Sequence, residues 1–196
     1  FAEAKLNTNE IAVARKYFEL AAKQNPQNSR VRTGLGLARL AAGDTDRALA
    51  DLEAAVGLGS SATADVLLVK TLMSVKKYDD ALKAVARLEA RRPADPITWN
   101  LKGAVLFAKR DIAGARKAFE RAGELQPAKF ATAMNLAQLD MQDDNPAEAR
   151  KRFEKILERD KNNVPAMLAL TDLAVASRNQ AEAMTWAERA RQAQAH

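Results

Sequence analysis

Small residues recur in this 196-residue chain at an interval of about 34 positions, and this period limits the fold more than any other feature. The successive steps are 34, 33, 34, 34 and 34 residues. Deleting one residue inside a helix would turn its apolar face by about 100°, so we place the shortened step in a loop. The period predicts a series of equivalent units that need one another for stability. The recurring small residues are Ala14, Ala48, Ala81, Ala115, Ala149 and Ala183.

Each of these alanines opens an apolar stripe with helical spacing. Phe119 and Ala122, for example, follow Ala115 by four and seven positions. Residues at i, i+4 and i+7 lie on one face of an α-helix. Another helical stretch precedes each stripe, and turn-forming residues such as Gly43 and Asp44 separate the two. Each unit is therefore predicted to be a pair of helices, and no segment alternates with the period of two that would indicate a strand.

Residues 95–127 show the unit most clearly, with the sequence DPITWNLKGAVLFAKRDIAGARKAFERAGELQP. The pattern residues are Trp99, Gly103, Ala115, Phe119, Ala122 and Pro127, at spacings of 4, 12, 4, 3 and 5. This pattern resembles the tetratricopeptide repeat, a helix–turn–helix unit of about 34 residues. The resemblance extends over essentially the whole chain. It implies an all-α fold, a right-handed superhelix of stacked repeats with a concave and a convex surface.

We expect a single array of six repeats, with the first one truncated. Phe1 falls inside a helical pattern, so we read the chain as an excerpt of a longer repeat protein, beginning with a remnant helix at Phe1 to Leu6. Val69 stands where small residues are usual, and Thr171 and Ala187 depart from the pattern at motif positions, but the period is kept. The expected repeats are residues 1–28, 29–60, 61–94, 95–128, 129–162 and 163–196. Ser29 is the expected N-cap of the helix that opens the second repeat.

A narrower resemblance concerns three runs, NLKGAVLFAKRDIAGARKAFERAGELQP, NLAQLDMQDDNPAEARKRFEKIL and NNVPAMLAL. These runs are similar to repeats of the large tetratricopeptide lipoprotein of PEP-CTERM/exosortase systems in Gram-negative bacteria. That family is linked to protein sorting and exopolysaccharide export. The resemblance implies a periplasmic or outer-membrane-associated location, and without it we expect a cytoplasmic one. The lipidated cysteine of that family would lie outside this excerpt.

The composition argues against catalysis. The chain has no cysteine, and its single histidine is His196 at the last position. The usual thiol nucleophile and internal imidazole base are therefore missing. The acidic pairs Asp79–Asp80 and Asp143–Asp144 precede helices, where carboxylates are expected to cap free N–H groups. We expect a non-enzymatic chain without cofactor or metal, and no apolar run approaches the roughly 20 residues that span a bilayer.

The repeat resemblance implies that the first helix of each repeat lines the concave groove. At these positions the chain has apolar residues mixed with amides, which suit the side chains and backbone of an extended peptide. Lys70, Asn100 and Asn135 do not reproduce the ordered set by which some family members clamp a carboxylate, so we do not expect a chaperone-tail binder. The predicted groove residues are Thr33, Leu37, Val66, Lys70, Met73, Asn100, Phe107, Met134, Asn135, Gln138, Met141, Leu168 and Asp172.

The net charge is +6, and many basic residues fall on the second helices. They are Lys83, Arg87, Arg91, Arg116, Lys117, Arg121, Arg150, Lys151 and Arg152. We favour a solvated convex face, since aromatic residues, the stacking platforms of nucleic-acid sites, make up only 5% of the chain. Binding of an acidic polysaccharide or nucleic acid by this face remains an alternative. A second alternative is that the chain is the regulatory region of a larger enzyme.

The main hypothesis is a non-catalytic scaffold. It binds a protein segment in the groove, with bacterial envelope export machinery as the expected setting. Protein partners are favoured over nucleic acid.

The repeat register can be tested with Ala115→Leu. If Ala115 lies at a close helix–helix contact, the larger side chain overpacks that contact and should lower the free energy of unfolding by about 1–3 kcal/mol. Urea unfolding followed by circular dichroism measures the change. A difference near zero would mean that the register is wrong.

Overall fold

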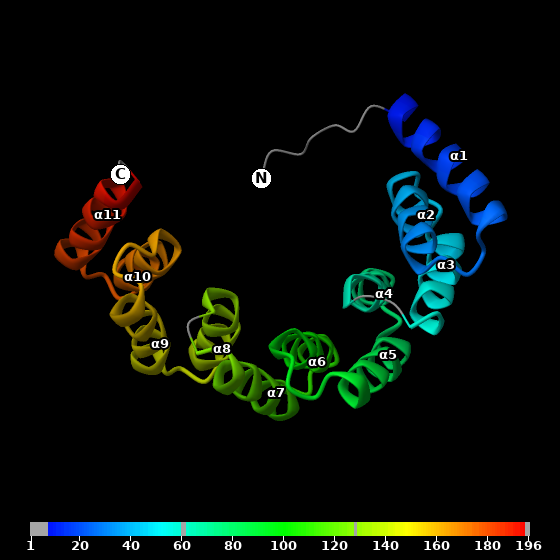
Figure 1. Ribbon diagram of the computed structural model, residues 1–196. Coiled ribbons are helices and arrows are strands. Elements are labelled where there is room, and N and C mark those ends of the chain that lie inside the picture. The colour runs from blue at the N-terminus through cyan, green and yellow to red at the C-terminus, as the bar shows by residue number, and fades with distance from the viewer. Residues whose placement is uncertain (1–7, 60–61, 128, 195–196) are drawn as a thin grey trace. The chain divides into compact units, whose positions relative to one another are not determined.

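The computed structural model describes residues 8–59, 62–127 and 129–194. Within these ranges the chain forms eleven α-helices and no strand, which confirms the predicted all-α fold (Figure 1). The helices are α1 (Thr8–Gln24), α2 (Ser29–Ala41), α3 (Thr45–Gly57), α4 (Ala62–Ser74), α5 (Tyr78–Arg91), α6 (Pro96–Ala108), α7 (Ile112–Leu125), α8 (Phe130–Gln142), α9 (Pro146–Arg159), α10 (Val164–Ala176) and α11 (Gln180–Gln194).

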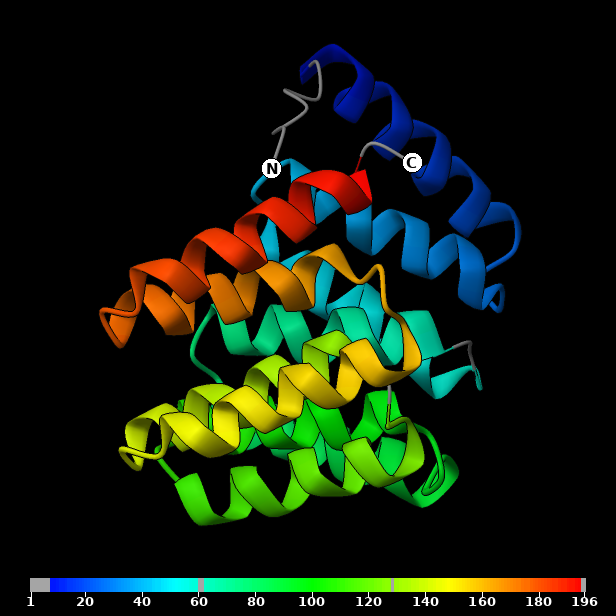
Figure 2. The same ribbon diagram turned by 90° about the vertical axis from the view of Figure 1, so that its left-hand side faces the viewer.

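The chain divides into two compact units, Phe1–Arg91 with α1–α5 and Arg92–His196 with α6–α11. Each predicted repeat from residue 29 onward contains one pair of these helices, whereas the expected remnant helix at Phe1 to Leu6 lies outside the described residues. In unit 2 the first helices α6, α8 and α10 form one layer and the second helices α7, α9 and α11 form another (Figure 1). Figure 2 shows these pairs stacked in chain order.

The turn between the two helices of a repeat has the same backbone conformation in all five repeats from residue 29 onward. In the fourth repeat the N–H of Arg110 donates to the carbonyl of Phe107 at 2.9 Å, and the N–H of Asp111 donates to that of Leu106 at 3.0 Å. These bonds satisfy carbonyls at the end of the first helix, and they require a left-handed residue in the turn. The residues with positive φ in these turns are Gly43, Lys76, Arg110, Asp144 and Arg178.

A polar side chain then caps the second helix. The carboxylate of Asp111 accepts from the N–H of Gly114 at 2.9 Å, and the side chain of Asn145 accepts from the N–H of Glu148 at 3.3 Å. Such caps satisfy N–H groups that have no partner inside the helix. The turn and the cap together fix where one helix stops and the next begins.

Two capping predictions are wrong. Asn28 rather than the neighbouring serine caps α2, since its side chain accepts from the N–H of Val31 at 3.2 Å. Asp143 and Asp144 do not cap α9. Asp143 bonds instead to Arg116 of α7 at 2.8 Å, and Asp144 takes the left-handed turn position.

The predicted alanine stripe is the buried face of the second helices, where Ala48, Ala81, Ala115 and Ala149 are each 0% exposed. In the fourth repeat the first helix comes so close to this face that glycine is needed. A Cβ atom on Gly103 would lie 2.5 Å from ring atoms of Phe119. A side chain of any size at that position would displace the phenylalanine.

The positions of Gly103 and Phe119 are 16 residues apart, and in other repeats the two equivalent positions are occupied by residues of other sizes. A Cβ atom on Gly36 would lie 2.9 Å from Cγ of Leu52. Where the first helix has Val69 instead of glycine, the second has the smaller Val85, and the two are 0% and 1% exposed. The departure of Val69 from the repeat pattern is thus matched by a residue opposite that is smaller than leucine or phenylalanine, and both valines fit in the buried contact.

Two glycines of unit 2 should respond in opposite ways to alanine. Gly103→Ala should lower the free energy of unfolding by about 1–3 kcal/mol, because the new methyl group overlaps Phe119. Gly123→Ala in α7 is the matched control, because its Cβ would meet only Cγ2 of Thr132 at 3.8 Å. It should raise the free energy by about 0.5–1 kcal/mol through helix propensity. Urea unfolding measures both, and equal effects of the two substitutions would contradict the packing described.

Candidate functional site

All thirteen predicted groove residues lie on first helices, namely α2, α4, α6, α8 and α10, but they differ in exposure. Their role in binding stays a prediction. Exposed side chains are Leu37, Lys70, Met134, Gln138, Met141, Leu168 and Asp172, partly buried ones are Val66, Met73, Asn100, Phe107 and Asn135, and Thr33 is buried.

Two of these residues have structural roles that the sequence did not indicate. Thr33 is only 8% exposed, and its hydroxyl donates to the carbonyl of Ser29 at 2.8 Å, so it offers little surface to a partner. The amide of Asn100 donates to the hydroxyl of Thr132 at 2.9 Å and to the carbonyl of Pro96 at 3.1 Å. Asn100 therefore connects α6 to α8, and its amide is already engaged within the first-helix layer.

A small apolar cavity opens between α8 and α10 of unit 2, with a volume of about 280 Å³. Buried side chains, including Phe153 and Leu173, form its floor. Met134 and Met141, which are 43% and 41% exposed, form walls, and the exposed Gln138 and Asp172 line it as well. The structure therefore brings together four predicted groove residues around one hollow: Met134, Gln138, Met141 and Asp172.

The sequence explains why this hollow forms. Met134 and Met141 are seven residues apart, so they project from the same face of α8. Ala137, Ala169 and Ala176 supply only methyl groups to the lining and leave space between the helices. Methionine side chains are flexible and polarisable, so these walls can adapt to different apolar groups. The volume lies just below the roughly 300–1,000 Å³ of sites for drug-sized molecules, and suits one side chain of a peptide better.

The predicted basic face of the second helices is largely neutralised by ion pairs. Arg150 of α9, for instance, pairs with Glu182 of α11 through both terminal nitrogens. Lys117 is the one member of the set without an ion pair in the described part of the chain. The other pairs are Lys83–Asp80, Arg87–Glu53, Arg91–Asp65, Arg116 with Asp140 and Asp143, Arg121–Glu124, Lys151–Glu148 and Arg152–Asp140.

This pairing weakens the case for binding an anionic polymer. Such binding depends on cations that are free to replace the counterions of a polyanion. A cavity of about 400 Å³ next to this face is lined by charges of both signs, including Glu120, Glu124, Lys129 and Lys155. A surface with mixed charges has little preference for a polyanion.

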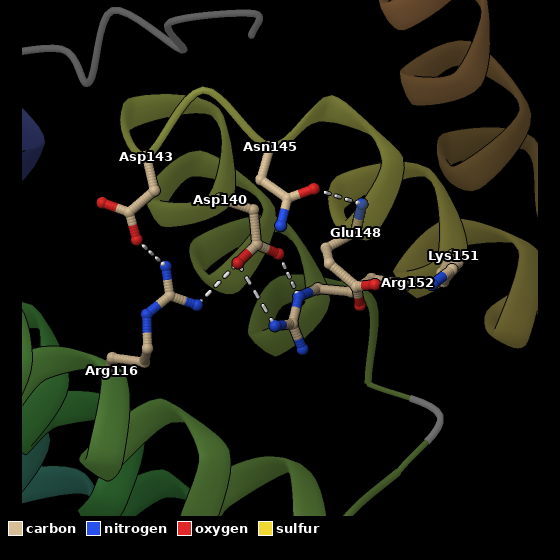
Figure 3. Close-up of polar contacts among 7 residues, drawn as sticks. All are labelled: Arg116, Asp140, Asp143, Asn145, Glu148, Lys151 and Arg152. Carbon is tan, nitrogen blue, oxygen red and sulfur yellow. Dashed lines mark hydrogen bonds and ion pairs between the residues drawn. The ribbon is translucent and has the colours of Figure 1, made fainter.

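The Asp140 cluster is the most developed of these ion-pair groups (Figure 3). Asp140 of α8 is 3% exposed, and it accepts hydrogen bonds from Arg116 of α7 at 2.6 Å and from Arg152 of α9. Arg116 also donates to the exposed Asp143 at 2.8 Å. The buried carboxylate therefore connects three consecutive helices and two repeats.

The environment of Asp140 lowers its pKa. Burial alone would raise the pKa of this carboxyl, but the hydrogen bonds and positive charges of Arg152 and Arg116 outweigh that effect. The pKa of Arg116 is raised: burial acts to lower it, and the contacts with Asp140 and Asp143 overcome this. The cluster is charged at neutral pH.

The buried aspartates that pair with arginine were not predicted from the sequence. Asp51, Asp65 and Asp140 are each 2–3% exposed, and each pairs with arginine from another helix. A signal was present, because each acid lies within a predicted helix next to apolar residues, as Asp51 does beside Leu52. An acid at such a position is rarely buried unless it is paired, which predicts an arginine partner.

Other kinds of site find no support in the described residues. No group of three or more His, Cys, Asp or Glu side chains there could hold a metal ion. None of the described helices combines the length and the apolar character needed to cross a membrane.

Comparison with known proteins identifies the class of protein. The tetratricopeptide repeat family model matches residues 1–63, 66–129 and 134–196, and the chain belongs to this family. Proteins with this fold are generally non-catalytic scaffolds for protein interaction. No curated protein matches the chain.

Solved structures with a similar fold include yeast Tom70, with 23% identity and a TM-score of 0.73 over 90% of this chain and 38% of that one. Pseudomonas aeruginosa pilF has 16% identity and a TM-score of 0.71 over 91% and 82%. YrrB, described as a repeat protein with an unusual peptide-binding site, has 19% identity and a TM-score of 0.58 over 92% and 94%. With sequence identities of 16–23%, these proteins share the fold with this chain, and the likeness shows nothing about a shared function. The chain spans little more than a third of Tom70.

The Asp140 cluster predicts a pH-dependent difference between two asparagine variants. Asp140→Asn should lower the free energy of unfolding by about 3 kcal/mol at pH 7, because two arginines lose a buried partner. Asp143→Asn is the matched control: it shares Arg116, but its carboxylate is 58% exposed, so the loss should stay below about 1 kcal/mol.

The sign of the pH dependence follows from the lowered pKa of Asp140. Its contribution is complete above the unfolded-state pKa of about 3.9 and is lost as the pH falls through the lower folded-state pKa. The difference between wild type and Asp140→Asn should therefore shrink between pH 5 and pH 3. Urea unfolding at these pH values measures it, and a constant difference would contradict the assignment.

Proposed function

We propose that this chain is a scaffold that binds an extended segment of a partner protein along the first-helix layer of unit 2. The observation that carries the proposal is the apolar cavity between α8 and α10, walled by two exposed methionines. Further exposed apolar side chains lie on the same helix layer, Ile97 on α6 and Leu168 on α10, at 46% each. Exposed apolar groups that gather on one surface are typical of a protein-interaction site.

The cavity and its rim offer what an extended peptide needs. An apolar side chain of the peptide can fill the hollow, while the amide of Gln138 can donate to and accept from its backbone. The second-helix layer differs, because most of its predicted basic residues are engaged in ion pairs. The first-helix layer of unit 2 is thus the better candidate for an interface.

The cellular setting that we propose is the bacterial envelope, with a role in protein sorting or exopolysaccharide export. The basis for this cellular setting is the resemblance of three sequence runs to the PEP-CTERM-associated lipoprotein. Expression of the full-length native protein, followed by fractionation of the cell envelope, tests it. Recovery in the cytoplasmic fraction would exclude it.

Binding can be tested with phage-displayed random decapeptides selected on the immobilised chain. The double variant Met134→Ser with Met141→Ser should weaken the selected peptides by about tenfold or more, equivalent to about 1.4 kcal/mol, because the cavity loses its apolar walls. Met184→Ser is the matched control, since Met184 is 68% exposed on α11 and lies outside the cavity. Fluorescence polarisation with a labelled peptide gives the dissociation constants.

Circular dichroism should show the same helix content for all three chains. If no peptide is selected, or if the double variant binds as tightly as wild type, the α8–α10 surface is not the interface.

A further inference from the structure

The charge around the α8–α10 cavity narrows the choice of ligand. The two helices contain only two ionisable side chains, Asp140 on α8 and Asp172 on α10. Asp140 is buried and paired with Arg116 and Arg152. Asp172 is exposed and lines the cavity, and in the described part of the chain it has no ion pair. The cavity therefore carries one uncompensated negative charge on an otherwise apolar and neutral surface.

This carboxylate can discriminate between ligands. Beside an apolar surface the effective dielectric constant is lower than in water, so a single charge has a stronger effect on a ligand group. A cation placed next to the apolar anchor would form a charge-assisted hydrogen bond with Asp172. An anion at the same place would be repelled, which adds to selectivity.

The charge is specific to this place in the repeat array. The repeat period places Asp172 at the same position as Gln138 of α8, Ala104 of α6 and Lys70 of α4. Within unit 2 the equivalent residues are therefore neutral, and in unit 1 one of them is basic. A preference for cations should thus depend on Asp172 alone and not on the fold in general.

We propose that the α8–α10 cavity selects peptide segments in which an apolar side chain stands next to lysine or arginine. The apolar side chain occupies the hollow over Phe153 and Leu173 between the two methionines. The neighbouring cation pairs with Asp172, and Gln138 bonds to the peptide backbone. This inference rests on the proposed function and adds the chemistry of the partner to it.

The test uses the decapeptides selected on the wild-type chain. We expect lysine or arginine to be enriched within two positions of an apolar residue, relative to the unselected library. A synthetic selected peptide should bind Asp172→Asn about fivefold to tenfold more weakly than wild type at low salt. Glu158→Gln is the matched control: Glu158 is an exposed acid on α9, so this change shifts the net charge equally but should leave binding unchanged.

Charge reversal gives a second measurement. A selection repeated on Asp172→Lys should enrich glutamate or aspartate in place of lysine and arginine. The effect of Asp172→Asn on binding should also shrink in high salt, because added ions screen an exposed pair.

Each outcome separates this inference from the proposed function. Peptides that need Met134 and Met141 but show no basic residue, or that bind Asp172→Asn as tightly as wild type, would overturn the charge preference and leave the interface in place. If Glu158→Gln weakened binding as much as Asp172→Asn does, the effect would be one of general charge, and the assignment of the preference to Asp172 would be overturned. A homodimer in solution that Asp172→Lys dissociates would assign the cavity to a second copy of the chain and overturn the peptide assignment.

Discussion

The close approach of the two helices within a repeat is the contact on which the rest of the structure depends. It needs a small residue on one helix wherever the other helix has a large one, as at Gly103 and Phe119. Val69 and Val85 divide the same space more evenly, and both are buried. Between these two repeats a larger residue on the first helix goes with a smaller one on the second, so individual residues can change while the contact stays filled.

This contact and the shared turn divide each repeat into two helices with different surfaces. The second helices carry most of the cations. Many of these are paired with acids on the same helix or on a neighbouring one, as in the Asp140 cluster. The first helices of unit 2 carry exposed apolar groups and few charges. A surface whose cations are mostly paired offers fewer free charges to a partner, whereas an exposed apolar hollow can take an apolar group. This difference is the physical basis for placing the interface on α8 and α10.

Much of the fold followed from the sequence because it depends on local and periodic signals. The 34-residue period, the alanine stripe and the turn residues predicted the helix pairs from residue 29 onward, and the family model confirms the class. The site was less predictable. Repeat positions indicated which residues lie on first helices, but not that Thr33 is buried or that Asn100 bonds to Thr132. The cavity depends on contacts between α8 and α10, which single-helix patterns do not give. The position of Asp140 indicated a paired acid, but which arginines pair with it depends on how three helices meet.

The most direct test of a ligand site at the α8–α10 cavity uses the methionines as probes. The chain has five methionines, and their methyl groups can be labelled with carbon-13 and assigned by substitution. Titration with a selected peptide should shift the NMR signals of Met134 and Met141 and leave those of Met73 on α4 and Met184 on α11 unchanged. Shifts confined to Met73 or Met184 would place the interface on another surface and contradict the account.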